Sequence, residues 1–353
     1  MSKFFSQKYK NLTPYVPGEQ PKEREYVKLN TNESPFPPSE LAISLVNEES
    51  KKVYLYSDPD SKDLTSTVAN YYGVKPEQVI MTNGSDEVLN FAFMAYCDKD
   101  NPAVFADITY GFYKVFAKIN GVPYKEIPLG EDFTISVDDY IKEKGTVFIA
   151  NPNAPTGINL PLSEIERLIK SNPDRIVVID EAYVDFGGES AIKLIDKYDN
   201  LLVTQTFSKS RSMAGARLGF GIASKEIISD LVNIKYSTNP YNVNRMTAVA
   251  GIGAVKDDEY FKNNCRTIVN NREFTSIELE RLGFSVTNSK TNFLFVKNGN
   301  ISGKELYLKL KERGILVRHF DKERIKDYVR ITIGSLQQMQ LLIKEIKNIM
   351  ENI

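Results

Sequence analysis

Polar and aromatic side chains follow closely after apolar segments that have the composition of buried strands. Lys209, Asp180, Asn153 and Tyr110 each lie within a few residues of the end of such a segment. In an open α/β sheet, ligands bind beyond the carboxyl ends of the strands, where these side chains would meet. An amine, a carboxylate, an amide and an aromatic ring together indicate a site for a small molecule with several different functional groups.

Each of these residues also has an ordinary structural explanation. An isolated lysine is usually exposed to solvent, and an aspartate that follows a strand often caps a helix. The segment Asn-Pro-Asn-Ala-Pro-Thr-Gly at 151–157 has the composition of a turn. A tyrosine is more often a packing residue than a ligand. The order of complementary groups along the chain, and not any one of them, favours a binding site.

The groups match the chemical requirements of pyridoxal phosphate. Lys209 can form a Schiff base with the aldehyde, and Asp180 can keep the pyridine nitrogen protonated. Asn153 and Tyr183 can donate hydrogen bonds to the phenolate oxygen, and the ring of Tyr110 can stack on the cofactor. We therefore predict that these residues hold pyridoxal phosphate, with Lys209, Asp180 and Tyr183 as the catalytic residues.

The phosphate of this cofactor requires a helix N-terminus, hydroxyl groups and a cation. Gly84, Ser85 and Asp86 lie at the start of a predicted helix, where backbone N–H groups can bind an anion and the acidic side chain need not face it. Ser208 and Arg217 supply the hydroxyl and the guanidinium. These five residues are the predicted phosphate site.

These residues require a sheet that brings distant strand ends together. Apolar strands are predicted at 79–82, 103–106, 147–150, 176–179 and 201–206, with helices at 63–72, 88–96 and 162–170. The strands are continuously apolar, which is typical of strands buried on both faces, and they are separated by helices. The sequence therefore predicts an α/β fold with a mostly parallel, doubly wound sheet.

The second half of the chain has a different pattern. A long helix is predicted near 257–281, followed by a strand, a helix, a strand at 328–333 and a terminal helix. This order predicts a smaller α+β domain. We expect an extended, proline-rich N-terminal arm over 1–38, a large cofactor-binding domain over 39–238 and a small C-terminal domain over 239–353.

The composition restricts the other classes of function. Lys and Arg number 45 against 46 Asp and Glu, so the chain lacks the basic excess typical of nucleic-acid binders. One histidine and two cysteines argue against a zinc site or a disulfide framework. No apolar run is long enough to span a bilayer, and the N-terminal segment does not have the pattern of a signal peptide. We expect a cytoplasmic protein that binds no metal, nucleic acid or membrane.

Several longer motifs carry a resemblance that covers essentially the whole chain. They are Leu-Thr-Pro-Tyr-Val-Pro-Gly-Glu-Gln-Pro at 12–21, Thr-Asn-Gly-Ser-Asp-Glu at 82–87, Asn-Pro-Asn-Ala-Pro-Thr-Gly at 151–157, Ile-Asp-Glu-Ala-Tyr at 179–183, Phe-Ser-Lys at 207–209 and Val-Arg-Ile-Thr-Ile-Gly at 329–334. The sequence resembles the fold-type-I pyridoxal-phosphate aminotransferases and, among them, the histidinol-phosphate aminotransferases.

The resemblance implies further roles for individual residues. Arg330 would bind the anionic group of the substrate, and Arg318 is a second candidate for this role. Asn30, Tyr15 and Asn292 would line the substrate side of the site. Tyr56 would reach the cofactor phosphate of a second subunit, so that the active protein would be a homodimer. His319 has no assigned role.

The implied reaction is a ping-pong transfer of an amino group from histidinol phosphate to 2-oxoglutarate. An aromatic amino-acid aminotransferase and a threonine-phosphate decarboxylase remain as alternatives with the same cofactor. Ala154 stands where the family frequently has Asn. A cofactor-sensing regulator would need an added DNA-binding domain. A dinucleotide-binding dehydrogenase is disfavoured because Gly251-Ile-Gly253 lacks the last glycine of that motif and follows no predicted strand.

Overall fold

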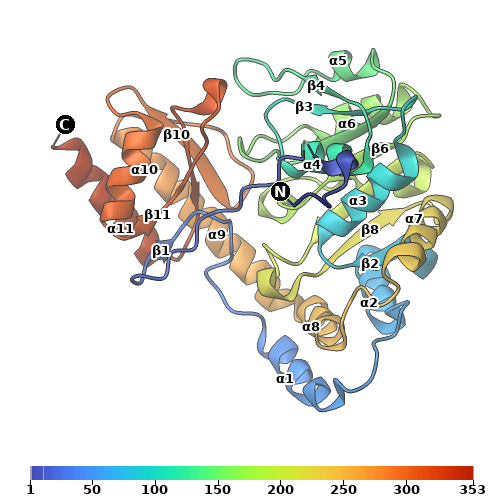
Figure 1. Ribbon diagram of the computed structural model, residues 1–353. Helices are drawn as coiled ribbons and strands as arrows, with labels where there is room; N and C mark the ends of the chain where they lie inside the picture. The colour runs from blue at the N-terminus through green and yellow to red at the C-terminus, as the bar shows by residue number, and fades with distance from the viewer. Residues whose placement is uncertain (1, 11, 353) are drawn as a thin grey trace.

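A computed structural model describes residues 2–10 and 12–352 of the chain, and its centre is a mixed β-sheet (Figure 1). Within these residues the sheet has seven strands in the order β2 (Val79–Thr82), β8 (Gly219–Ala223), β7 (Leu201–Thr206), β6 (Val177–Asp180), β5 (Thr146–Ala150), β3 (Ala103–Ala106) and β4 (Tyr124–Ile127). β8 runs antiparallel to both of its neighbours, and the other pairs are parallel. The predicted α/β fold with a mostly parallel sheet is confirmed.

Two strands of this sheet were not expected from the sequence. β4 lies at the edge of the sheet and carries Lys125 and Glu126, so it lacks the apolar run of a central strand. β8 contains Gly219 and Gly221, which weaken a strand signal. A Cβ atom on Gly219 would lie 2.3 Å from the backbone nitrogen of Ser85, so this strand can pass the start of α3 only as glycine.

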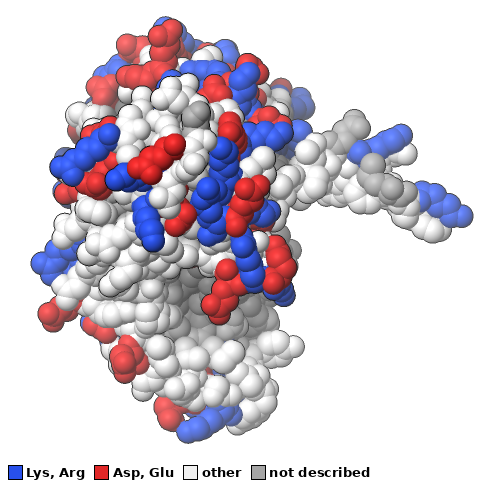
Figure 2. Space-filling view, turned by 90° about the vertical axis from the view of Figure 1, so that its left-hand side faces the viewer, with Lys and Arg blue, Asp and Glu red and all other residues white. Residues whose placement is uncertain are grey.

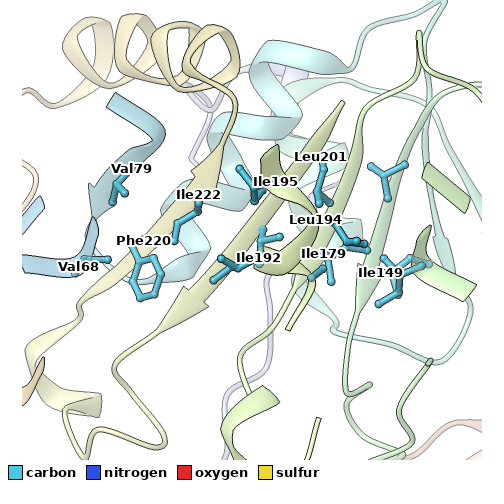
Figure 3. Packing of buried hydrophobic residues seen from close by; sticks show 14 of the residues in the cluster. Val68, Val79, Ile149, Ile179, Ile192, Leu194, Ile195, Leu201, Phe220 and Ile222 are labelled. Atoms are coloured by element: carbon cyan, nitrogen blue, oxygen red, sulfur yellow. The ribbon is translucent and has the colours of Figure 1, made fainter. Parts of the chain in front are cut away.

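Helices cover both faces of the sheet. Alternate strand residues point to opposite sides, and those on both sides are buried apolar residues. Val178 belongs to a core with α3 (Ser85–Tyr96), α4 (Phe112–Asn120) and α7 (Lys225–Thr238). Ile179 belongs to another core with α2 (Lys62–Tyr72), α6 (Leu162–Lys170) and the 3-10 segment η5 (Ala191–Lys197). Figure 3 shows residues of η5 packed over strand residues such as Ile179 and Leu201. Because helices cover both faces, a ligand can reach this sheet at the ends of its strands.

The C-terminal part forms a second, antiparallel sheet in the order β12 (Arg318–His319), β13 (Val329–Thr332), β10 (Phe293–Asn298) and β9 (Phe284–Val286). Its helices are α9 (Asp258–Arg281), α10 (Gly303–Glu312) and α11 (Leu336–Met350). The N-terminal arm joins this part, because β1 (Val27–Lys28) pairs in parallel with β11 (Ile315–Leu316). The arm thus spans from the large sheet to the small one (Figure 1).

The expected division between residues 238 and 239 stays a prediction. Helix α8 (Arg245–Lys256) packs against α1 (Glu40–Glu49) and α2, and its Ala250 and Ala254 belong to a core of the large sheet. Phe261 on α9 belongs to the core of the small sheet. The buried side chains therefore change from one core to the other between α8 and α9. No helix in the described part of the chain is long and apolar enough to cross a membrane.

Candidate active site

The carboxyl ends of the central strands open into a cavity of about 470 Å³, which the N-terminal arm and the small sheet also border. It is lined by these residues predicted from the sequence: Tyr15, Asn30, Ser85, Asp86, Tyr110, Asp180, Tyr183, Ser208, Lys209, Arg217, Arg318 and Arg330. Strand ends far apart in the sequence therefore meet in one cavity, as the parallel order of the sheet requires.

Lys209 lies in this cavity three residues after the end of β7. Its Nζ donates a hydrogen bond to the carbonyl oxygen of Thr31 in the arm, at 3.3 Å. Burial, assisted by the positive charge of Arg330, lowers the pKa of the Lys209 amine to about 8. A lowered pKa increases the fraction of neutral amine near pH 8, and the neutral amine is the form that attacks an aldehyde.

Asp180 is the last residue of β6 and is buried against the cavity. The hydroxyl of Tyr113 donates to its Oδ2 at 2.9 Å, whereas Oδ1 has no hydrogen-bond partner among the described residues. Burial raises the pKa of this carboxyl to about 7. A buried carboxylate oxygen without a partner is costly unless a ligand satisfies it. A protonated pyridine nitrogen is a ligand of this kind, so the arrangement fits the cofactor predicted from the sequence.

The predicted phosphate site lies at the first turn of α3. The helix begins at Ser85, three residues earlier than expected, after Gly84 with φ of 79°. The first N–H groups of a helix have no partners within the helix and favour an anion. Arg217 approaches this turn in a left-handed conformation, with φ of 55°. A Cβ atom on Gly84 would lie 2.8 Å from Nη2 of Arg217 and would displace this guanidinium, and the positive φ itself favours glycine.

The side chain of Asp86 connects the phosphate site to the predicted stacking residue. Its carboxylate accepts one hydrogen bond from Nη2 of Arg217 at 3.1 Å and another from the hydroxyl of Tyr110 at 2.7 Å. The ring of Tyr110 meets that of Tyr113 edge to face, with ring centroids 5.7 Å apart. Asp86 therefore orients both Arg217 and Tyr110 at the edge of the cavity.

Two arginines of the small sheet, Arg318 on β12 and Arg330 on β13, also line the cavity. Arg330 donates through Nη2 to the carbonyl of Asn30 at 3.2 Å, while its buried Nε has no partner within the described residues. Arg318 donates to the carbonyls of Val16 and Pro17 at 2.9 and 3.0 Å. Backbone carbonyls of the arm thus hold both guanidinium groups, which can bind a carboxylate or a phosphate through paired hydrogen bonds.

Comparison with known proteins agrees with this geometry. A sequence model of the aminotransferase class I and II family matches residues 24–346. The chain belongs to this aminotransferase family. It is 48% identical over its whole length to histidinol-phosphate aminotransferase from Brachyspira hyodysenteriae, which it also covers completely. It is 47% identical, over 98% of its length and 99% of the relative, to the enzyme of the same name from Clostridium acetobutylicum.

Solved aminotransferase structures have the same fold. Histidinol-phosphate aminotransferase from Sinorhizobium meliloti, solved in complex with pyridoxal-5'-phosphate, superposes with a TM-score of 0.91 and 21% identity, over 100% of this chain and 99% of that chain. At this identity the likeness shows the fold alone. Together with the family match, it confirms that the protein is an aminotransferase of fold type I.

Four predicted residues of this aminotransferase do not line the cavity: Gly84, Asn153, Tyr56 and Asn292. Gly84 is adjacent to the guanidinium of Arg217. Asn292 donates through Nδ2 to the carbonyl of Asn32 at 3.0 Å, so it supports the arm. Tyr56 is 80% exposed and stacks on Tyr241, with ring centroids 4.7 Å apart.

The structure does not support the expected hydrogen bond from Asn153 to the cofactor. Both amide hydrogens of Asn153 are already used, by the carbonyl of Ile108 at 2.9 Å and the hydroxyl of Thr156 at 3.1 Å. Its Oδ1 accepts from Thr109 at 2.8 Å. The side chain therefore holds the loop together, and its neighbour Ala154 lines the cavity instead.

Sequence reasoning missed two residues that contact the site. Tyr113 lies on α4, whereas Tyr110 precedes this helix, so the spacing of the two residues in the sequence did not mark Tyr113 as a site residue. Asn32 in the arm donates to the hydroxyl of Tyr183, and its left-handed φ of 56° has no local sequence signal.

Proposed function

We propose that the protein is a pyridoxal-phosphate-dependent aminotransferase that transfers the amino group of histidinol phosphate to 2-oxoglutarate, yielding imidazole acetol phosphate and glutamate. The observation that carries the proposal is one cavity that contains a lysine of lowered pKa, a buried aspartate with an unpaired oxygen and two arginines. Relatives that are 43–48% identical over almost the whole chain are named histidinol-phosphate aminotransferase.

When bound, pyridoxal phosphate supplies the aldehyde and the electron-withdrawing ring that this chemistry needs. Lys209 would hold the cofactor through its amine, and the same amine would move a proton at the substrate carbon. Asp180, whose Oδ1 is unpaired, would keep the pyridine nitrogen protonated. The first turn of α3, Ser208 and Arg217 would hold the phosphate.

Arg330 and Arg318 bind the anionic end of each substrate in turn. In the first half of the reaction this group is the phosphate of the amine, and in the second half it is a carboxylate of 2-oxoglutarate. An aromatic amino-acid aminotransferase or a threonine-phosphate decarboxylase would use the same lysine and aspartate. The choice of amine separates the first alternative, and release of CO2 without transfer of the amino group separates the second.

A substrate panel tests the proposal. The purified protein with pyridoxal phosphate is mixed with histidinol phosphate, phenylalanine or threonine phosphate, and the absorbance of the bound cofactor is followed. We expect histidinol phosphate to convert the bound aldehyde to the amine form fastest. Lys209→Ala should abolish turnover and the lysine-dependent absorbance, whereas the exposed Lys99→Ala control should keep both. Retention of both by Lys209→Ala would contradict the proposal.

We also propose that the active form is a cytoplasmic homodimer in which Tyr56 reaches the partner's cofactor phosphate. Tyr54 and Tyr56 are 81% and 80% exposed, and Val53 and Leu55 beside them are exposed as well. Large apolar side chains grouped on a surface are typical of an interface. Basic and acidic side chains intermingle over the upper part of the molecule in Figure 2, whereas the lower part, at the height of α1, carries few of them. The two buried, unpaired cysteines fit a reducing compartment.

A further inference from the structure

Asn32 connects the N-terminal arm, the small sheet and the large sheet through a continuous set of hydrogen bonds. Its backbone N–H donates to Oγ1 of Thr332 at 2.9 Å, and its carbonyl accepts from Asn292 at 3.0 Å. Its side chain contacts Thr332 again at 3.0 Å and the hydroxyl of Tyr183 at 2.9 Å. Asn32 is buried and has a φ of 56°, a conformation that asparagine tolerates better than most residues.

These contacts determine which way the Asn32 amide points. Oγ1 of Thr332 already accepts the N–H of Asn32, so its own proton is free to go to Oδ1 of Asn32. The NH₂ group of Asn32 must then face Tyr183 and donate to it. Because the Tyr183 oxygen accepts this bond, its own O–H proton remains available for a different acceptor. Tyr183 lines the cavity beside Lys209 and Asp180, where the phenolate oxygen of the cofactor is the acceptor that its proton can meet.

The loop at 151–157 lines the cavity with Pro152, Ala154 and Pro155, none of which has a side-chain donor. Asn153 uses its whole amide within the protein, through Ile108, Thr156 and Thr109. Ala154 borders the cavity with a methyl group, which cannot donate a hydrogen bond.

We propose that Asn32 is a positioning residue that directs the Tyr183 proton to the phenolate oxygen of pyridoxal phosphate, and that Tyr183 serves this oxygen without a second donor from the loop at 151–157. The inference rests on the proposed function. It assigns Asn32 an effect on the cofactor that a purely structural residue of the arm would not have.

The pH titration of the bound cofactor reports this hydrogen bond. A hydrogen-bond donor to the phenolate reduces the negative charge on its oxygen. The phenolate then stabilises the proton on the nitrogen between Lys209 and the cofactor less strongly, so the pKa of this nitrogen falls. Fewer or weaker donors therefore raise the pH at which this nitrogen loses its proton, and an added donor lowers that pH. The absorbance of the bound cofactor follows this proton without any turnover.

We would compare three substitutions in the full chain loaded with pyridoxal phosphate. Asn32→Gly keeps the left-handed backbone and removes the side chain, and Asn32→Asp replaces the donor with an acceptor that draws the Tyr183 proton away. Both should raise the midpoint by about half to one pH unit, the size expected for one hydrogen bond. Ala154→Asn should lower the midpoint by a similar amount, and Ala154→Ser is a smaller replacement if the asparagine does not fold.

Tyr183→Phe separates positioning from a structural effect. In the Tyr183→Phe background, Asn32→Gly should produce no further shift, because the hydroxyl that it orients is gone. The exposed Asn300→Gly serves as a control and should leave the midpoint unchanged. Unchanged midpoints in Asn32→Gly and Asn32→Asp, or a full additional shift in the double variant, would overturn the inference. A wild-type protein without any Lys209-dependent absorbance would instead contradict the proposed function.

Discussion

Single side chains in the cavity depart strongly from their ordinary acid–base behaviour. Burial moves the pKa of Lys209 down to about 8 and that of Asp180 up to about 7. Both shifts disfavour charge, which is the expected effect of removing a group from water. Both shifts suit a cofactor with an aldehyde and a protonated ring nitrogen. The neutral amine of Lys209 is the nucleophile for the aldehyde, and the ring nitrogen gives Asp180 a cationic partner.

The Asp180 carboxyl should make the cofactor-free protein less stable as the pH rises. Its pKa is 3.8 in the unfolded chain and about 7 in the folded protein, so between these values the folded state binds the extra proton. The free energy of unfolding therefore falls with rising pH across this window. Between pH 5 and 8, the free energy of unfolding of the wild-type protein should therefore fall by on the order of 2 kcal/mol more than that of Asp180→Asn. Chemical denaturation of both proteins at each pH measures the difference, and parallel curves would contradict it.

Arg330 should be sensitive even to replacement by lysine. A guanidinium group binds a carboxylate with two parallel hydrogen bonds, which an ammonium group cannot reproduce. Arg330→Lys should raise the KM for 2-oxoglutarate about tenfold or more, the effect of losing one charged hydrogen bond. Steady-state kinetics measure this change. Arg313→Lys, on the surface beside Glu345, is the matched control and should keep the wild-type KM.

At the scale of elements, the start of α3 depends on its neighbour β8. The helix turns in at Gly84 with a positive φ, Gly219 passes close to Ser85, and Arg217 lies against the turn. The phosphate site therefore comes from two elements that are far apart in the sequence and adjacent in the sheet. Gly219 is required by its close approach to the backbone of Ser85, and Gly84 is favoured by its positive φ.

Replacing Gly84 should weaken both cofactor binding and the fold. In Gly84→Ala the new methyl group meets Arg217 at 2.8 Å, and the residue keeps an unfavourable φ of 79°. We expect a loss of roughly 1–2 kcal/mol in stability and about tenfold weaker binding of pyridoxal phosphate. Equilibrium dialysis and thermal unfolding measure the two effects. Gly299→Ala, where a Cβ atom meets open space, should change neither.

At the scale of the whole molecule, the arm links both sheets and the cavity between them. Leu29 of the arm belongs to the core of the small sheet, and Thr31 and Asn32 contact residues of the large one. Tyr56, in contrast, lies outside its own cavity on an exposed apolar surface. The proposed dimer would place it in the cavity of the partner subunit.

Subunit mixing tests this arrangement. Tyr56→Ala and Lys209→Ala homodimers should each have little activity. In a mixed dimer, one of the two sites would contain Lys209 from the Tyr56→Ala subunit and Tyr56 from the Lys209→Ala subunit. This site would have both native residues. Random mixing should then restore about a quarter of the wild-type activity. No recovery, together with proof of subunit exchange by mass, would show that Tyr56 does not serve the partner's site.

The sequence predicted much of the fold because its signals were local. Five of the central strands are continuous apolar runs, and each was located within one residue of its observed bounds. β4 and β8 were missed, because charged residues at a sheet edge and glycines at a close approach hide the strand pattern.

What the sequence by itself determined is the set of groups at or just after the strand ends, including Lys209, Asp180 and Tyr183. A residue that ends or closely follows a buried strand must lie near the edge of the sheet. Only the tertiary structure decided which of these groups face the cavity. Asn153 turns into its loop and Asn32 comes from the arm to hold Tyr183. The physical reason is that the direction of an amide depends on its hydrogen-bond partners, and here these partners lie far away in the sequence.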